Sequence, residues 1–384
     1  MRIIRLFKEL FNFKKLITVF KIVKNFYFNN YSKYPNYVIS FEREISKKFN
    51  AKYCLSFANA TIATQTAMRS IGLKKKSKIL VSKICFPSTF ISILRSGFEP
   101  VVADFDKDLN VILNEKILNT DIKAFCMSHI FGYPIDIKNI EKLKKNFQDI
   151  KIISDCSHAH GAMIGEKSIV NFSDISIMSL QGAKAISGGE GGVAFTNNIN
   201  YFNSMIELSH PSRNLTDGSR NDNFPGFSKL TKGRMHPFAA ILASYDLYNL
   251  DRKNKELKKK IKLIYKILEN VTSIYLPNIN IDETGGYHYG IPLIFNNNRE
   301  KILNKTNISL INFRYPKYEY HDEFKNPDMY DEFISGGSNL NYKTYSEKNT
   351  PDIRDDLYII DLNWIKSINL KNLENEIVKF KKLF

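Results

Sequence analysis

The sequence predicts an α/β protein, in which a large domain with a mostly parallel mixed sheet flanked by helices precedes a smaller C-terminal α+β domain. Between about residues 40 and 200, segments with helical spacing alternate with short apolar runs, as in strands joined by crossover helices. One long helical pattern follows, and residues 274–350 are then rich in Asn, Tyr and Gly. The expected division is an N-terminal extension over 1–37, a large domain over 38–254 and a small domain over 255–384.

Each element of the large domain is predicted from its apolar spacing. Helices are expected over residues 40–50, 61–73, 89–98 and 137–147. Strands are expected over residues 78–84, 99–106, 123–131 and 151–157, with a further pair over 176–180 and 191–197. Strands that alternate with helices in this way predict a sheet covered on both faces.

The later helices are also visible in the pattern. A long helix is expected over 234–268, where Pro237 suits the first turn, and a closing helix over 372–384. The composition of residues 274–350 sets no strand order.

The N-terminal extension over 1–37 is basic and approximately amphipathic. Lys and Glu interrupt its apolar residues, so it contains no apolar run of about 20 residues that would span a membrane. Two interpretations stay open: a helix that packs on the body or on a partner subunit, and a helix in peripheral contact with a membrane surface.

The chain of 384 residues carries a formal net charge of +17. Solvated surface lysine, a phosphate-bearing substrate and nucleic acid each account for such an excess. Because no zinc-finger, recognition-helix or RNP pattern is present, no nucleic-acid partner is expected.

The four cysteines are scattered singly among apolar residues, with no CxxC pair and no histidine at metal-ligand spacing. We therefore expect no metal site, and reduced, buried thiols in a cytoplasmic protein. These cysteines are Cys54, Cys85, Cys126 and Cys156.

An acidic residue, two histidines and a lysine point to a chemical site. Asp155 ends an apolar run, at the edge where open α/β sheets bind ligands, and His158 and His160 follow on the exit loop. Lys184 stands between an apolar lead-in and a glycine-rich turn, where a buried ammonium is costly unless it is paired or used. A lysine with a distant carboxylate suits pyridoxal 5'-phosphate, although Asp155 could also be an N-cap or half of an ion pair.

A phosphate group would need backbone N–H groups at a helix N-terminus together with hydroxyls. Asn59, Ala60 and Thr61 open one of the predicted helices, and Thr61 offers its hydroxyl. Asn59 could equally serve only as the N-cap of that helix.

Six runs in order carry a resemblance to a known family: NATIATQTAMRSIGL, ICFPSTFISILRSGFEPVVADFD, SHIFGYPIDI, DCSHAHGA, KAISGGEGG and RMHPFAA. Together they resemble the DegT/DnrJ/EryC1/StrS family of fold-type-I pyridoxal-phosphate aminotransferases, from about residue 38 to about residue 255. The resemblance implies that Lys184 is the Schiff-base lysine and that Asp155 pairs with the pyridine nitrogen. It also implies that His158 lies near the phenolic oxygen of the cofactor, where many members have Gln, and that Phe86 stacks on the pyridine ring.

The resemblance implies a phosphate site as well. Thr61 and Ser179 occupy the positions of the phosphate-binding hydroxyls, and Ala60 stands where the family usually has a small residue. Lys232 replaces an Asn that, in the family, reaches the phosphate from the neighbouring subunit. A lysine there would contact phosphate as a point charge, or would simply be exposed.

Three further residues are candidates for substrate binding. His210 and Arg213 lie on a polar loop, and Arg234 follows it. Arg234 would bind a donor carboxylate or an acceptor phosphate, or support the subunit interface. Solvated loop charges are the alternative for His210 and Arg213.

The resemblance implies a homodimer that transfers an amino group from glutamate or glutamine to a keto acceptor, in surface polysaccharide or capsule biosynthesis. The acceptor is a sugar-like ketone or a small phosphorylated ketose such as dihydroxyacetone phosphate, with a nucleotide-linked keto-sugar as the alternative. A dehydratase, in which His replaces the lysine, and a non-enzymatic basic binding protein are less favoured because Lys184 and its surroundings are present.

Overall fold

The computed structural model describes residues 34–210, 213, 231–296, 302–303, 305–313, 343–345 and 353–384. Most of the predicted extension over 1–37 therefore lies outside the described residues. In the described parts of the chain, no helix is both long enough and apolar enough to cross a membrane.

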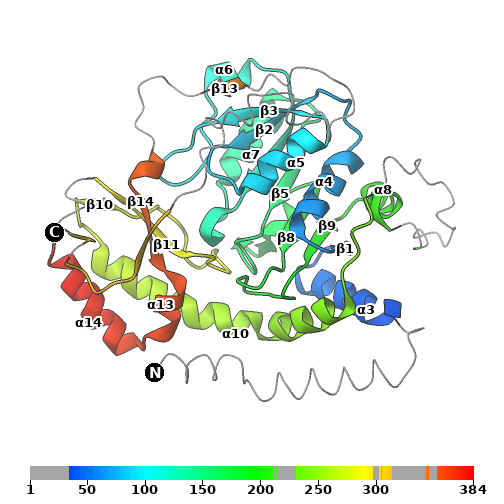
Figure 1. The fold of residues 1–384 in the computed structure, drawn as a ribbon. Coiled ribbons are helices and arrows are strands. Elements are labelled where there is room, and N and C mark those ends of the chain that lie inside the picture. Colours follow the sequence, from blue (N-terminus) through cyan, green and yellow to red (C-terminus); the bar gives the residue numbers. More distant parts are fainter. Residues whose placement is uncertain are drawn as a thin grey trace.

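A large mixed sheet runs through the centre of the molecule (Figure 1). In spatial order its strands are β1 (Tyr53–Phe57), β9 (Gly192–Thr196), β8 (Ile175–Ser179), β5 (Lys151–Asp155), β4 (Ile122–Ser128), β2 (Lys78–Ser82), β3 (Glu99–Ala103) and β13 (Lys343–Tyr345). Strand β9 is antiparallel to both of its neighbours, whereas all other adjacent pairs are parallel. The mostly parallel sheet is confirmed.

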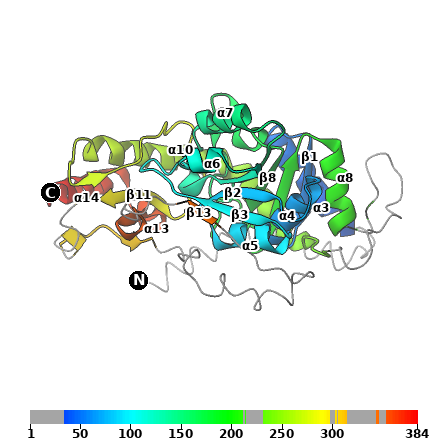
Figure 2. The same cartoon turned by 90° about the horizontal axis from the view of Figure 1, so that it is seen from above.

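Helices cover both faces of this sheet, as Figure 2 shows for α5 and α7. One face packs against α4 (Ala60–Ser70), α5 (Pro87–Arg95) and α8 (Ile199–Ser209). The other packs against α3 (Tyr34–Lys48), α6 (Glu115–Leu118), α7 (Ile137–Asn146) and α10 (Pro237–Leu268). Both faces are covered because successive side chains of a strand point to opposite faces of the sheet. In β4, Ala124 and Cys126 pack in the core under α4, α5 and α8, whereas Phe125 and Met127 pack in the core under α6 and α7.

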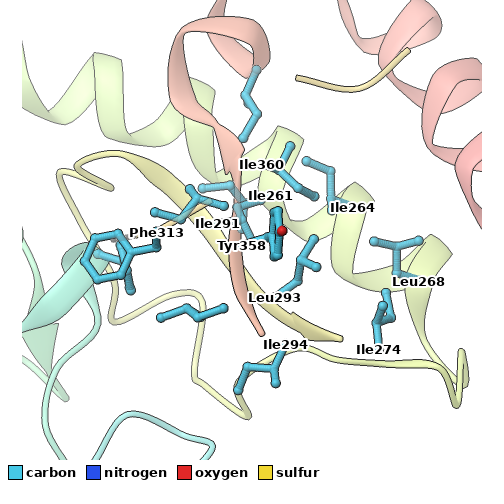
Figure 3. Close-up of a cluster of buried hydrophobic side chains, with 14 of the residues drawn as sticks. Ile261, Ile264, Leu268, Ile274, Ile291, Leu293, Ile294, Phe313, Tyr358 and Ile360 are labelled. Carbon is cyan, nitrogen blue, oxygen red and sulfur yellow. The ribbon is translucent and has the colours of Figure 1, made fainter. Parts of the chain in front are cut away.

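A smaller sheet packs on the C-terminal half of α10. Its strands lie in the order β10 (Ile274–Tyr275), β11 (Gly290–Phe295), β14 (Leu357–Asp361) and β12 (Leu310–Asn312). Side chains of β11 and β14 meet Ile261, Ile264 and Leu268 of α10 in one apolar core (Figure 3). Helices α13 (Leu362–Ser367) and α14 (Leu370–Lys381) complete this core.

Short elements complete the described chain. They are η2 (Ile130–Gly132), β6 (Met163–Ile164), β7 (Lys167–Ser168), η3 (Ile169–Asn171) and η6 (Ile353–Asp355).

Most predicted elements are confirmed, and Pro237 opens α10 as expected. Two features differ from the sequence pattern. Helix α10 continues without a break through the expected boundary at residue 254, and β13, from the range assigned to the small domain, pairs with β3 of the large sheet. The division into three parts therefore remains a prediction. The four cysteines are buried and free, as expected.

Candidate active site

Several predicted site residues meet at one edge of the large sheet. Asp155 and Ser179 are the last residues of β5 and β8, and Phe86 follows β2 on the way into α5. Parallel strands that end together bring such residues to a common edge. Lys184 lies on the loop between β8 and β9, which starts from the same edge.

Two neighbours hold the Asp155 carboxylate. The Thr89 hydroxyl donates to Oδ2 at 2.9 Å, and the Ser157 backbone N–H donates to Oδ1 at 3.0 Å. A carboxylate has about four lone-pair positions, so each oxygen keeps acceptor capacity for a further donor. Thr89 is buried on the first turn of α5, and the sequence analysis missed it. Its signal was its place three residues after Phe86, one helical turn further on.

The Lys184 amine is largely removed from water. Burial lowers its pKa to about 8, and the nearby negative charge of Asp155 opposes this shift. The loop is held by its own backbone, because Lys184 N–H donates to the Gln181 carbonyl at 2.9 Å and Gly188 N–H donates to the Leu180 carbonyl at 2.8 Å. With the lowered pKa, about a tenth of the amine is neutral at pH 7, far more than for an exposed lysine.

The N-terminus of α4 lies against the start of β9. A Cβ on Gly192 would lie 2.5 Å from the Ala60 nitrogen, so only glycine permits this approach. The Asn59 side chain accepts from Ile62 N–H at 2.9 Å, which identifies it as the N-cap, one of the two roles that the sequence left open. Ala60 and Thr61 follow it in the half-buried first turn, where backbone N–H groups have no partner within the helix.

The ring of His158 has a defined orientation and tautomer. Phe131 N–H donates to Nδ1 of His158 at 3.3 Å, so the proton of the neutral ring is on Nε2. Phe131 has a φ of 56°, in the left-handed region that is costly for an aromatic residue. The strained turn thus aims a backbone donor at His158. Burial and the nearby positive charge of Lys184 lower the pKa of His158 and keep it neutral.

A second histidine, which the sequence analysis missed, packs on the first. The ring centroids of His158 and His288 are 4.5 Å apart, and His288 is buried. Burial, followed by the charge of Lys184, lowers the pKa of His288 to about 2, against a backbone hydrogen bond with Ala183. His288 therefore contacts both the His158 ring and the residue before Lys184.

The backbone of segment 285–290, which contains His288, packs directly against the backbone of the loop after β5. A Cβ on Gly286 would lie 2.6 Å from the His158 carbonyl oxygen. Asn254 of α10 bridges the two segments, because it donates to the His160 carbonyl at 2.8 Å and accepts from Gly286 N–H at 3.2 Å. Strand β11 of the small sheet begins at Gly290, the last residue of this segment, so the small sheet is attached directly to the candidate site.

Ser179 and Phe86 complete the edge. Ser179 is half-buried, and its carbonyl accepts from Nε2 of His160 at 2.9 Å. Phe86 is the N-cap residue of α5 and exposes 44% of its surface. An aromatic ring that the core leaves this exposed is available to cover one face of a planar ligand.

The structure gives Arg213 and His210 structural partners. Arg213 forms a two-point ion pair with buried Glu42, at 3.0 and 2.7 Å, and Glu42 also accepts from Ser56. His210 is buried edge-on against the Phe57 ring, and its Nδ1 is 2.7 Å from the Ser209 hydroxyl. These contacts are structural, and the substrate-binding role expected for both residues stays a prediction.

The segment of Lys232 and Arg234 lies beside α4. The Gly233 carbonyl accepts from Ala58 N–H at 2.7 Å, and its Cα packs against Ile62 of the same chain. Lys232 and Arg234, on either side of Gly233, are exposed. Lys232 thus starts beside the first turn of α4 of its own chain, and its contact with a phosphate across a dimer stays a prediction.

Five buried histidines predict a steep loss of stability in acid. His129, His158, His160, His210 and His288 all have pKa values lowered, chiefly by burial. Below pH 6.5 the unfolded chain binds protons that the folded chain does not, so the free energy of unfolding falls as the pH decreases. Because an unfolded histidine is on average half protonated between pH 7.5 and 5.5, each group removes about 1.4 kcal/mol over this whole range, and the five together remove about 7 kcal/mol.

Urea unfolding followed by circular dichroism at these two pH values measures this loss. The exposed His236, an N-cap residue, offers the control, since His236→Asn keeps a capping side chain and should leave the pH dependence unchanged. An equal urea midpoint at pH 7.5 and 5.5 would contradict the neutral state of the buried rings.

The groups at this edge of the large sheet fit pyridoxal phosphate. The site combines a buried amine of lowered pKa, a carboxylate with acceptor capacity, a helix N-terminus beside hydroxyls, and an exposed aromatic ring. Lys184 would bond the aldehyde carbon and Asp155 would accept from the ring nitrogen. Thr61, Ser179 and the first turn of α4 would hold the phosphate.

Comparison with known proteins agrees with this chemistry. The family model described as the DegT/DnrJ/EryC1/StrS aminotransferase family matches residues 21–332. The GDP-perosamine synthase of Escherichia coli O157:H7 is 28% identical over 176 residues, 45% of this chain and 48% of that protein. The dTDP-3-amino-3,6-dideoxy-alpha-D-galactopyranose transaminase of Aneurinibacillus thermoaerophilus is 24% identical over 256 residues, 65% of this chain and 68% of that protein.

The chain spans about half the length of the perosamine synthases that it matches. Among solved structures, the E coli GDP-4-keto-6-deoxy-D-mannose-3-dehydratase with bound hydrated PLP has a TM-score of 0.74 at 16% identity, covering 96% of each chain. This likeness shows that the fold is that of the fold-type-I pyridoxal-phosphate enzymes. Because the family model matches well over half of the residues, the chain belongs to the DegT/DnrJ/EryC1/StrS aminotransferase family.

Proposed function

We propose that the protein is a pyridoxal-phosphate-dependent aminotransferase that moves an amino group from glutamate or glutamine to the ketone of a nucleotide-linked sugar. The observation that carries the proposal is the buried Lys184 amine, with a pKa of about 8, within electrostatic reach of Asp155. Membership of an aminotransferase family supports the reaction class. The relatives named for GDP- and dTDP-linked sugars support the acceptor class.

Pyridoxal phosphate, when bound, supplies a ring that withdraws electrons from the donor carbon. The chain's own residues supply the rest. The Asp155 carboxylate, oriented by Thr89 and Ser157, keeps the ring nitrogen protonated. The neutral Nζ of Lys184 takes the proton from the donor Cα in the first half of the reaction. In the second half the same amine gives a proton to the former carbonyl carbon of the acceptor.

The remaining groups orient the cofactor. His158 offers its Nε2–H as a donor to the phenolic oxygen, in the place of the Gln of many family members. Thr61 and Ser179 hold the phosphate, with Lys232 as a further cation, and Phe86 covers one face of the ring. Arg234 remains a proposed contact for a donor carboxylate or acceptor phosphate.

Lysine at position 184 favours transamination over dehydration. The dehydratase branch of the family has His in that position, and an imidazole cannot bond the cofactor as the amine does. A small ketose phosphate such as dihydroxyacetone phosphate, which the sequence favoured over a nucleotide-linked sugar, becomes the alternative acceptor because the named relatives act on nucleotide-linked sugars. We further propose a homodimer that acts in surface polysaccharide or capsule biosynthesis.

Transfer of nitrogen from labelled donors tests the reaction and the acceptor together. The loaded enzyme is incubated with ¹⁵N-glutamate or amide-¹⁵N and amino-¹⁵N glutamine, and with GDP-, dTDP- and UDP-linked 4-keto-6-deoxy sugars or dihydroxyacetone phosphate. We expect mass spectrometry to detect the label in a nucleotide-linked amino sugar. If the label appeared only in the product of dihydroxyacetone phosphate, the acceptor would be a small ketose phosphate and not a nucleotide-linked sugar. If no acceptor gave a labelled amine, the proposed function would be contradicted.

The pKa of Lys184 predicts how cofactor capture depends on pH. The neutral amine bonds the aldehyde, so the rate of capture by the cofactor-free protein should rise about tenfold per pH unit below pH 8 and level off above it. Stopped-flow absorbance between pH 6 and 10, with N-acetyl-lysine as the unburied control, measures this. A rate that keeps rising to pH 10 would show that the amine has an ordinary pKa.

Lys232 offers a test of the phosphate site. Lys232→Ala should raise the dissociation constant of pyridoxal phosphate severalfold, as expected for one exposed charge, and leave that of pyridoxal without phosphate unchanged. Lys47→Ala, on the exposed face of α3, is the control. An equal effect on both ligands would assign Lys232 a different role.

A further inference from the structure

A cavity of about 600 Å³ opens beside the catalytic lysine. One face of α10 forms a wall of it, and Figure 1 shows this helix running past the large sheet to the small one. Six cationic side chains and one acidic side chain line it: Lys184, Arg252, Lys253, Lys259, Lys260 and Lys366, with Glu256. Positive charge gathered in a concave site attracts and concentrates anions.

Two of these cations have structural partners that fix the wall. Lys253 pairs with Asp246 at 2.7 Å, and the Lys260 amine binds the carbonyl oxygens of Ile365 and Ile368, at 2.8 and 2.6 Å, at the end of α13. The first contact lies within α10, and the contacts of Lys260 join α10 to the end of α13. The shape of the cavity is therefore set by buried and half-buried groups before any ligand enters.

Two other cations of α10 are exposed and can contact a ligand. Arg252 and Lys259 both lie on the solvent side of α10, two turns apart. Arg252 pairs with Glu256 at 3.1 Å, but an exposed pair one helical turn apart is weak, so a ligand anion can replace the carboxylate. An arginine fork binds phosphate oxygens in two places, and a lysine adds a point charge.

We infer that this cavity binds the diphosphate of a nucleotide-linked acceptor, an inference that rests on the proposed function and names the residues that select its substrate. The cavity is also lined by Lys184, so a molecule whose diphosphate is held on the α10 wall can also reach the reacting amine. Its volume is in the range of about 300–1,000 Å³ that encloses drug-sized ligands. A three-carbon phosphate would fill a small part of it.

The residues that line the cavity also predict that it does not discriminate between nucleobases. Among the described residues that line it, none is aromatic, so no ring is available there to stack on a nucleobase. Recognition should therefore depend on the phosphates and vary little with the base.

Equilibrium binding to the cofactor-loaded protein tests the inference without turnover. Isothermal titration calorimetry is carried out with UDP, GDP, dTDP, inorganic pyrophosphate and glycerol 3-phosphate, at low and high salt. We expect the three nucleoside diphosphates to bind with dissociation constants within about threefold of each other, pyrophosphate to compete with them, and salt to weaken binding. Glycerol 3-phosphate, the probe for a small phosphorylated ketose, should bind at least about tenfold more weakly.

Matched variants locate the site. The double variant Arg252→Gln with Lys259→Gln should raise the dissociation constant for UDP about tenfold. Lys144→Gln with Lys145→Gln removes the same charge from the exposed end of α7 and should leave the dissociation constant unchanged. The control variant, Lys144→Gln with Lys145→Gln, should also accept an amino group from the donor at the rate of the parent protein.

Two results would overturn the inference: UDP affinity equal in the two double variants, or glycerol 3-phosphate bound as tightly as UDP. Neither outcome depends on transamination. If the loaded protein takes no amino group from glutamate or glutamine, the proposed function fails, whereas the location of the anion site is still decided by the binding data.

Discussion

Lys184→Ala is expected to lower the rate of amino transfer by at least about 10⁴-fold, because the variant has no amine to bond the cofactor or to move the proton at the donor Cα. Lys184→Arg should be equally slow, since a guanidinium keeps the charge but does not deprotonate near neutral pH. Mass spectrometry of labelled amino sugar measures both. A rate within tenfold of the parent protein in either variant would contradict the role of the amine.

The fold should survive this change. Burial lowers the pKa of Lys184 to about 8, so the charged amine destabilises the folded state below that pH. Lys184→Ala is therefore expected to unfold at the same temperature as the parent protein or at a higher one. A loss of activity with a lowered unfolding temperature would point to damage to the fold instead.

Asp155→Asn is expected to lower the rate of amino transfer by about 10³-fold, the usual cost of removing one preorganised electrostatic contact. The amide keeps the size of the side chain and an oxygen for Ser157 N–H, but it has no negative charge to keep the ring nitrogen protonated. Steady-state rates at saturating donor and acceptor, with cofactor content measured in parallel, provide the comparison.

Thr89→Val is the matched partner of that variant. It removes the hydroxyl that donates to Asp155 at 2.9 Å but leaves the carboxylate charge, and one hydrogen bond is worth about 1 kcal/mol. Its rate should fall less than tenfold. If Asp155→Asn had no larger effect than Thr89→Val, the carboxylate would be acting only through its hydrogen bonds and not through its charge.

The sequence was informative where a residue's role depends on its place along one strand. Asp155 and Ser179 end β5 and β8, so the parallel sheet itself brings them to one edge. Lys184 could be singled out because burying a lone ammonium, here between an apolar run and a glycine-rich turn, costs free energy unless the group is paired or chemically used.

Contacts between distant segments were not visible in the sequence. His288 is 130 positions beyond His158, and their rings meet only because Asn254 and a glycine-lined junction hold segment 285–290 against the loop after β5. Arg213 is predicted from the sequence as a candidate for substrate binding or as a solvated loop charge, because its partner, Glu42, lies 171 positions earlier. The sequence pattern gives no sign of either pairing.

Short strands were also beyond prediction. Strand β13 has three residues and joins the edge of the large sheet from a segment whose composition resembles a loop. The order of the small sheet depends on which strands pack over Ile261 and Ile264 of α10, and helical or strand spacing carries no information on such pairing.

The visible absorption spectrum of the purified protein with pyridoxal phosphate, before and after addition of glutamate or glutamine, tests the role of Lys184 most directly. We expect a visible band of the bound cofactor that is absent from Lys184→Ala, disappears with one of these donors and returns with a nucleotide-linked keto-sugar. A protein that forms no such band, or whose band is unchanged by both amino acids, would contradict the assignment of Lys184 and the proposed transamination.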